Sequence, residues 1–175
     1  MTFLKDVYPL VRAKVPGARL WIFGGVDARV TAARSACFDQ PGVKVFDFVD
    51  DVHPYLQNCS ISINPDKNVR GSSLKVVESL AAGRVCVSTR DGARGLMGAN
   101  LPSLVIAHEN DFADRIVRLL MDVEYRHRLE VPTEALHQYS WQRASEKHAQ
   151  IYRSLLQTGY STPTYAFAQA GTQGQ

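Results

Sequence analysis

The chain has 175 residues, enough for one domain with a substantial hydrophobic core and too few for a second complete domain. Its hydrophobic fraction of 45% and charged fraction of 21% are typical of globular proteins and not of disordered chains. The formal net charge of +3 is a small surplus, and the basic residues are interspersed with acidic ones, so a nucleic-acid partner is not expected.

Segments of strand type and helix type alternate along the first two thirds of the chain. The strand-type segments are short, apolar and rich in β-branched or aromatic residues, whereas the helix-type segments have apolar residues at helical spacing. In chain order we expect a helix over residues 2–14 bent near Pro9, a strand over 18–23 that stops at Gly24 and Gly25, a helix over 27–38, a strand over 43–49, a helix with Asp50 as its N-cap, a strand over 60–64, a helix from the cap residue Ser72 to Ala82 with Gly83 at its C-terminus, and strands over 85–89 and 103–107.

Helices dominate the last third of the chain. We expect them over residues 111–121, over 124–138 with an interruption at Pro132, and over 140–157. Residues 158–175 are rich in small and polar residues without periodicity, which predicts a disordered tail. Alternating strands and helices of this length predict an α/β fold with a doubly wound parallel sheet, followed by C-terminal helices.

Cysteine usage and hydropathy indicate the cellular compartment. Cys37, Cys59 and Cys86 are an odd, widely spaced set without a C-x-x-C pair, so we expect buried free thiols in a reducing compartment. No apolar segment approaches the roughly 18 residues of a membrane span, and the first residues do not form a secretory leader. We therefore expect a cytoplasmic protein. The histidines lack the spacing of a metal site, and no metal or other cofactor is expected.

The most informative segment lies between two predicted strands and reads Arg70, Gly71, Ser72, Ser73, Leu74 and Lys75. A small-residue turn that leads into a helix presents unpaired backbone N–H groups and the positive end of a helix dipole, which suit an anionic diphosphate. Glycine and serine allow a ligand to approach closely, and the flanking Lys75 and Arg70 can neutralise phosphate oxygens.

A carboxylate follows the turn at Glu78, about one helical turn later. It can accept hydrogen bonds from two adjacent hydroxyls, as acidic residues do for the ribose of bound nucleotides. Taken alone, the turn is better explained as an ordinary helix cap with a solvated lysine and Glu78 as a helix-surface charge, and Arg70 is equally explained as a solvated loop residue. Their order along the chain is what favours a binding site.

That order resembles the C-terminal domain of family 4 glycosyltransferases, which have the GT-B fold, over about residues 3 to 157. The landmarks are the strand ending in Gly24 and Gly25, the segment from Val45 to Asp51 with Tyr55 and Leu56, the turn with Lys75 and Glu78, the strand over 85–89 followed by Gly92 and Gly95, and Ser140 with Trp141.

The resemblance implies a role for each matching residue. Glu78 would bind the ribose hydroxyls and Lys75 the diphosphate. The family's stricter form has a second glutamate where Arg70 stands here. The remaining donor-binding positions are Arg70 and Gly71 beside the phosphates, the amides of Ser72, Ser73 and Leu74 for phosphate and sugar, the glycine turn of Gly24 and Gly25, and the main chain of Val49 and Asp50 around the base.

The resemblance also implies that this chain is one half of a GT-B fold. The family's domain opens with a central strand, whereas this chain begins in the helix that follows it. We therefore expect a Rossmann-like donor-binding domain over residues 1–157, incomplete at its N-terminus, with two strands that lack their shared neighbour. The acceptor domain, which precedes this domain in the family, would be a separate part of the enzyme.

A complete enzyme of this kind would transfer a sugar from a nucleoside diphosphate sugar to a carbohydrate or lipid-linked acceptor, without an obligatory metal. A lipid-linked acceptor would bring it to a membrane surface. We expect the chain alone to bind nucleotide weakly and to catalyse no transfer. Two alternatives remain open, namely an inactive fragment or nucleotide-binding module without transferase activity, and a sugar-nucleotide epimerase of the same architecture.

Overall fold

The computed structural model describes residues 3–24, 36–68, 73–130 and 134–157. The chain divides into two compact units, residues 1–137 and 138–175, and each is described by itself. The expected tail over 158–175 lies outside the described residues, as does most of the expected helix over 27–38.

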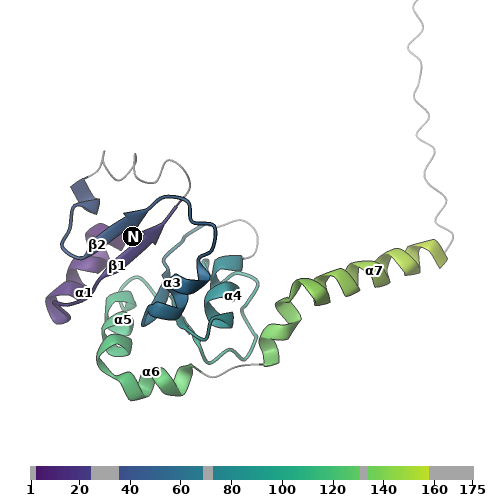
Figure 1. Ribbon diagram of the computed structural model, residues 1–175. Helices are drawn as coiled ribbons and strands as arrows, with labels where there is room; N and C mark the ends of the chain where they lie inside the picture. The colour runs from purple at the N-terminus through teal and green to yellow at the C-terminus, as the bar shows by residue number, and fades with distance from the viewer. Residues whose placement is uncertain (1–2, 25–35, 69–72, 131–133, 158–175) are drawn as a thin grey trace, which may run out of the picture. The chain divides into compact units, whose positions relative to one another are not determined.

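The first unit alternates strands and helices, as the sequence predicts (Figure 1). An opening π-helical turn runs directly into an α-helix, and the helices α5 and α6 follow the last strand. In chain order the elements are η1 (Phe3–Val7), α1 (Tyr8–Lys14), β1 (Leu20–Phe23), η2 (Ala36–Phe38), β2 (Val43–Phe46), α3 (His53–Asn58), β3 (Ile61–Asn64), α4 (Leu74–Ala81), β4 (Val85–Ser88), β5 (Leu104–Ile106), α5 (Phe112–Met121), α6 (Val123–Leu129) and the start of η3 (Glu134–Tyr139).

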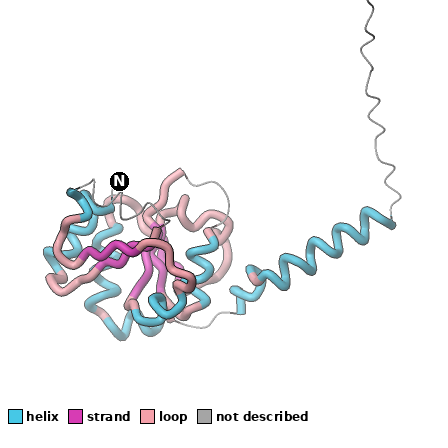
Figure 2. Tube along the Cα trace, turned by 45° about the horizontal axis from the view of Figure 1, so that its top comes forward, coloured by secondary structure: helices cyan, strands magenta, loops and turns pink. Residues whose placement is uncertain are grey.

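The strands form two parallel sheets, one of β1 and β2 and one with the order β3-β4-β5 (Figure 2). Leu20 pairs with Val43 in the first sheet, and Ile61 pairs with Val85 in the second. Among the described residues β1 and β3 each have a neighbouring strand on one edge only. This agrees with the expectation of two strands without their shared neighbour.

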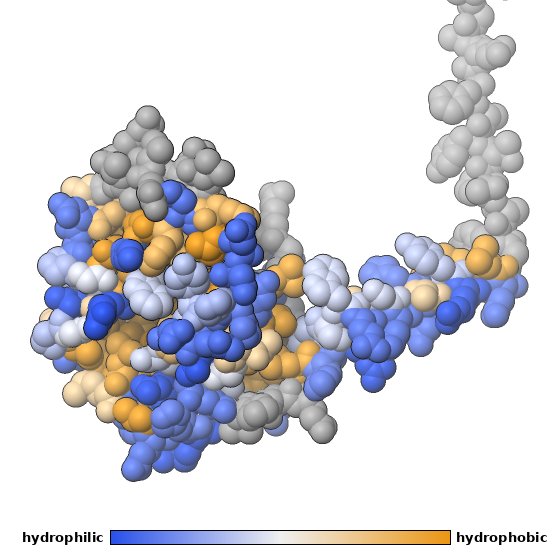
Figure 3. Space-filling model, viewed as in Figure 1, coloured by the Kyte–Doolittle hydropathy of each residue, from blue (hydrophilic) through white to orange (hydrophobic). Residues whose placement is uncertain are grey.

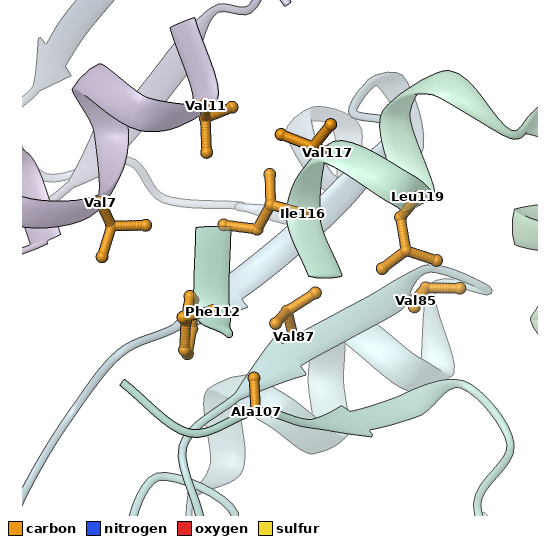
Figure 4. Close-up of a cluster of buried hydrophobic side chains, with 9 residues drawn as sticks. All are labelled: Val7, Val11, Val85, Val87, Ala107, Phe112, Ile116, Val117 and Leu119. Carbon is orange, nitrogen blue, oxygen red and sulfur yellow. The ribbon is translucent and has the colours of Figure 1, made fainter. Parts of the chain in front are cut away.

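The hydrophobic core lies between β4 and the helices α1 and α5 (Figure 4). All residues of β4 are buried because the strand has a neighbour on both edges and helices on both faces. Side chains of a strand alternate between its faces. Val85 and Val87 therefore point together toward α5, where Phe112 and Leu119 are almost completely buried.

The other face of β4 is covered by α4. Its buried residues Val76, Ser79 and Leu80 lie on one side of the helix, at the spacing of an amphipathic helix. The Ser79 hydroxyl makes a short hydrogen bond to the Ser62 hydroxyl of β3. α4 is thus held against the second sheet by packing and by a hydrogen bond, which fixes the position of its first turn.

Two predicted helix caps are wrong. α3 begins at His53, and the side chain that accepts a hydrogen bond at its start belongs to Asp51, which binds the His53 N–H at 2.8 Å. Asp50 is therefore not the N-cap, because Asp51 makes the turn with the residue two positions later, as aspartate commonly does. α4 has Ser73, not Ser72, as its N-cap residue.

The C-terminus of α4 is as predicted. Gly83 has a φ of 75°, in the left-handed region that favours glycine. Its N–H binds the Leu80 carbonyl at 3.0 Å, and the N–H of Arg84 binds the Ser79 carbonyl at 3.1 Å. This pair of bonds is the Schellman motif, which satisfies carbonyls that the helix leaves open. The turn leads the chain directly into β4.

Strand ends and cysteine burial differ in detail from the sequence-based expectation. β2 ends at Phe46 and not at residue 49, because its partner β1 ends opposite it at Phe23. Of the cysteines, Cys86 alone is buried, whereas Cys37 and Cys59 are partly exposed and all are free thiols. Cys59 lies at the end of α3 and not inside a strand.

The second unit contains α7 (Trp141–Gln157) and the end of η3. No residue of α7 is buried, and its visible side chains are mostly hydrophilic with a few hydrophobic ones between them (Figure 3). In the described parts of the chain, no helix combines the length and the hydropathy of a membrane span. The exposed large apolar side chains of α7 are Trp141, Ile151, Tyr152, Leu155 and Leu156.

Candidate functional site

The candidate site lies where β3 ends and α4 begins. Because β3 and β4 are parallel, their carboxyl ends lie at the same edge of the second sheet. Ligands of open α/β sheets commonly bind at this edge. The loop after β3 carries Asp66, the loop after β4 carries Thr89, and the first turn of α4 carries Lys75.

The exposed side of α4 presents the charged residues of the predicted motif. Lys75 and Glu78 are both exposed and lie three positions apart, and so they share a face of the helix. Leu74, which precedes them, is 49% exposed. The buried side of the helix packs on the sheet, so these side chains are fixed on the side that faces solvent.

Ser73 introduces the helix. Its carbonyl accepts hydrogen bonds from the N–H groups of Val76 at 3.0 Å and Val77 at 3.3 Å. Its side chain is almost entirely buried, 5% exposed, yet the hydroxyl oxygen has no hydrogen-bond partner among the residues that the structure describes. A buried hydroxyl without a partner is costly in free energy and calls for an explanation. In any α-helix the first amides have no carbonyl of a preceding helical turn to bind, so they are available to other acceptors.

The Lys75 ammonium is paired with the carboxylate of Asp66 in a short ion pair. The Lys75 side chain is 58% exposed and the Asp66 side chain 39% exposed, so solvent weakens the attraction between them. Asp66 follows β3 by only two residues, and the pair therefore joins the end of the strand to the first turn of α4.

A buried network joins the loop after β3 to the loop after β4. The Asn64 side-chain amide donates to the Gly92 carbonyl at 2.8 Å, and the Asn64 carbonyl accepts from the Thr89 N–H at 3.1 Å. The Thr89 hydroxyl accepts from the Gly92 N–H at 2.9 Å and donates to the Asp66 carbonyl. Asn64 is 2% exposed and Thr89 7% exposed. The hydrogen bond from Thr89 thus fixes the position of the Asp66 main chain.

The thiols of the second sheet and of the residue that leads into it are not poised for nucleophilic chemistry. Burial raises the pKa of the Cys86 thiol to about 11, and burial also raises the pKa of Cys59. A thiol is a nucleophile only as the thiolate, which is scarce for Cys86 at neutral pH.

The other predicted donor-binding residues lie elsewhere or cannot be placed. Gly24 follows β1, and Val49 and Asp50 follow β2, so they belong to the edge of the first sheet. Val49 is partly buried and Asp50 is exposed. The structure brings Ser73, Leu74, Lys75 and Glu78 together on α4. Gly25, Arg70, Gly71 and Ser72 lie outside the described residues.

Comparison with known proteins places the chain in a family. The family described as "Glycosyl transferases group 1" matches residues 1–122. The chain belongs to the group 1 glycosyltransferases. No curated protein matches the sequence.

Among solved structures, this group 1 glycosyltransferase chain is similar to "WaaG, a glycosyltransferase involved in lipopolysaccharide biosynthesis". The TM-score is 0.57 at 12% sequence identity, and the match covers 79% of this chain. At this identity the similarity concerns the fold, a Rossmann-like α/β half of the GT-B architecture. The chain spans 40% of the length of that solved protein.

Several residues of this candidate site were missed by the sequence interpretation. Asn64, Asp66 and Thr89 organise the two loops, yet none was singled out. A signal was present in the sequence, because two successive apolar strands each end in a polar residue, Asn64 in one and Ser88 in the other. In a parallel sheet such positions meet at one edge, which would have predicted their proximity.

Proposed function

We propose that this chain is the donor-binding half of a glycosyltransferase and that it binds the diphosphate of a nucleoside diphosphate sugar at the first turn of α4. The proposal rests on the location of the turn at the carboxyl ends of parallel strands, where open α/β sheets bind ligands. The single observation that carries it is the Ser73 hydroxyl, which is buried, lacks a hydrogen-bond partner within the described part of the chain, and lies beside helix amides that suit an anion.

Lys75 would supply the cation for this diphosphate. It occupies the second position of α4 and its ammonium is already engaged by a carboxylate, which indicates that an anionic group fits there. A lysine hydrogen-bonded to a phosphate oxygen makes a charge-assisted bond, which is roughly twice as strong as a neutral one. Helix amides and the ammonium together would stabilise the negative charge that develops on the departing diphosphate.

Glu78 would bind the ribose. Its exposed carboxylate lies on the same face of α4 as Lys75, one helical turn further from the phosphate position. A carboxylate accepts hydrogen bonds only, and so it matches a pair of adjacent hydroxyls. We include no metal or other cofactor in the proposal, because the helix amides and Lys75 supply positive charge where the diphosphate would bind.

The sugar would be transferred to a carbohydrate or lipid-linked acceptor that another part of the enzyme holds. The proposal assigns this chain the donor only, since bringing donor and acceptor together requires a second binding surface. A lipid-linked acceptor would place the enzyme at a membrane surface. The competing proposal, a module of the same fold without useful nucleotide affinity, makes the opposite prediction in the titrations below.

The test is to titrate the full 175-residue chain with a panel of nucleoside diphosphates and to measure binding by calorimetry. Lys75→Ala should weaken the binding of the preferred nucleotide about tenfold or more, because it removes a hydrogen bond to a charged group worth about 1.5–3 kcal/mol. Lys14→Ala is the matched control. Lys14 also pairs with an aspartate on the surface, Asp114, and its side chain is 57% exposed.

The Lys14 variant should bind nucleotide as the original chain does. Equal affinity of the Lys75 and Lys14 variants would refute the proposed phosphate position. Binding of none of the nucleotides, by a chain that circular dichroism shows to be folded, would favour the module without nucleotide affinity.

The ribose assignment has its own test. The original chain should bind a 2′,3′-dideoxynucleoside diphosphate about tenfold more weakly than the ribose form, since the carboxylate of Glu78 loses both hydroxyl donors. Glu78→Ala should bind both forms with equal, reduced affinity. Glu124→Ala, which removes an exposed glutamate from the first turn of α6, should keep the full discrimination. A Glu78 variant that still discriminates would exclude Glu78 as the ribose ligand.

A further inference from the structure

We propose that Asp66 is a built-in counter-anion, which occupies Lys75 in the unliganded protein and competes with the diphosphate for it. This inference rests on the function proposed above and adds a residue that sets the affinity and charge preference of the site. It starts from the ion pair between the Asp66 carboxylate and the Lys75 ammonium on the first turn of α4.

The main chain of Asp66 is held in place from the interior. The Thr89 hydroxyl donates to the Asp66 carbonyl, and Thr89 is itself fixed by its N–H bond to the Asn64 carbonyl at 3.1 Å. Thr89 and Asn64 are both buried. The carboxylate of Asp66 therefore stays near Lys75 even when the two separate, because only the aspartate side chain is free to rotate away.

The backbone of Asn68, two residues after Asp66, also helps to hold the loop after β3 in place. Asn68 has a positive φ of 54°, and its N–H donates to the Asp91 carboxylate at 3.2 Å. The loop after β3 is thus tied to the loop after β4 on both sides of Asp66. A ligand cannot displace Asp66 by moving the whole loop without breaking several hydrogen bonds, some of them buried.

Competition of this kind favours ligands with more charge. A single carboxylate carries one negative charge, whereas pyrophosphate carries several and can also use the helix amides. A bound diphosphate would therefore take Lys75 from Asp66, at the cost of repulsion from the nearby carboxylate. Orthophosphate, with less charge, would gain less from the exchange. Because the pair is partly exposed, this competition should weaken at high salt.

The experiment compares pyrophosphate binding by the full chain and by Asp66→Asn. The variant should bind pyrophosphate about threefold more tightly at low ionic strength, the scale of an exposed ion pair, with a smaller gain at high salt. In the Lys75→Ala background the same change should bring little gain, since the competition acts through Lys75. Asp114→Asn, which breaks the exposed pair with Lys14, is the control and should change nothing.

Equal or weaker pyrophosphate binding by Asp66→Asn would overturn the inference and leave the proposed function standing, provided that the original chain binds. An equal gain in the presence and absence of Lys75 would also overturn it, because Asp66 would then act by general charge. Should neither chain bind pyrophosphate or any nucleoside diphosphate, the inference and the proposed function both fail. Asp66→Ser provides a second variant, and it should show the same gain as Asp66→Asn.

Discussion

Gly92 occupies a position where any side chain would collide with the buried network. A Cβ there would lie 2.8 Å from the Asn64 side-chain nitrogen and from the Ser88 hydroxyl, and 2.9 Å from the Asn64 carbonyl. Real Cβ atoms do not approach polar atoms so closely, and the surroundings are buried on all sides. The glycine is therefore required by close packing between the two loops.

Gly92→Ala should lower the free energy of unfolding by about 1–3 kcal/mol, the usual cost of overpacking a buried site. Gly17→Ala is the matched control, because a Cβ at Gly17 meets no atom within 4 Å. Urea denaturation followed by circular dichroism measures both variants. A Gly92 variant as stable as the Gly17 variant would show that the loops move apart at little cost.

Residues with a local signal were predicted and those with only a tertiary role were not. Gly83 was identified as the C-terminal cap of α4, because a glycine after an apolar-periodic segment needs only local geometry to be explained. Lys75 and Glu78 were proposed from the small-residue turn before them and from the family resemblance, and their roles stay predictions. Asp66 and Thr89 were missed, since their partners lie far away in the sequence and meet only when β3 and β4 pair.

At the level of elements, the pairing of the strands predicts their protection from hydrogen exchange. β4 has neighbours on both edges, whereas β1 and β3 have one neighbour each among the described residues. The N–H of Leu20 binds the Gly42 carbonyl on the side of β2, and successive N–H groups of a strand point to opposite edges. The N–H groups of Trp21 and Phe23 therefore point to the open edge of β1.

We expect the amides of Trp21 and Phe23 to exchange faster with deuterated solvent than those of Cys86 and Val87 in β4. Exchange of the β4 amides should require unfolding of the whole unit, because they are buried and paired on both sides. Amide-resolved exchange by NMR measures the difference. Slow exchange at Trp21 and Phe23 would indicate that another segment covers the edge of β1.

The type and order of the elements were predictable from the sequence, and their ends were not. Short apolar runs rich in β-branched residues located each strand of the second sheet, because such runs are typical of strands inside a fold. The end of β2 at Phe46 depends on where β1 stops, which is a property of the pair. The N-cap of α3 is Val52, which has no capping side chain, and so the rule that predicted a polar cap at Asp50 could not locate it.

At the scale of the whole molecule, the fold class followed from the alternation of elements, and the family match and the similarity to a GT-B structure confirm it. The division of the strands into two sheets also agrees with the expected interruption between β1 and β3. The first turn of α4 as the centre of a donor site stays a prediction, and the loops that frame this turn in the structure were not singled out from the sequence.

Among the described residues β1, β2, β3 and β5 each have one edge without a neighbouring strand, and such edges affect how a protein behaves at high concentration. An unpaired strand edge is a template on which a strand of another molecule can add, and so it promotes aggregation. Charged side chains beside an edge oppose such addition, and both Arg19, just before β1, and Lys44, on β2, are exposed. β3 and β5 have no charged residue within their spans, and this protection is weakest for these two strands.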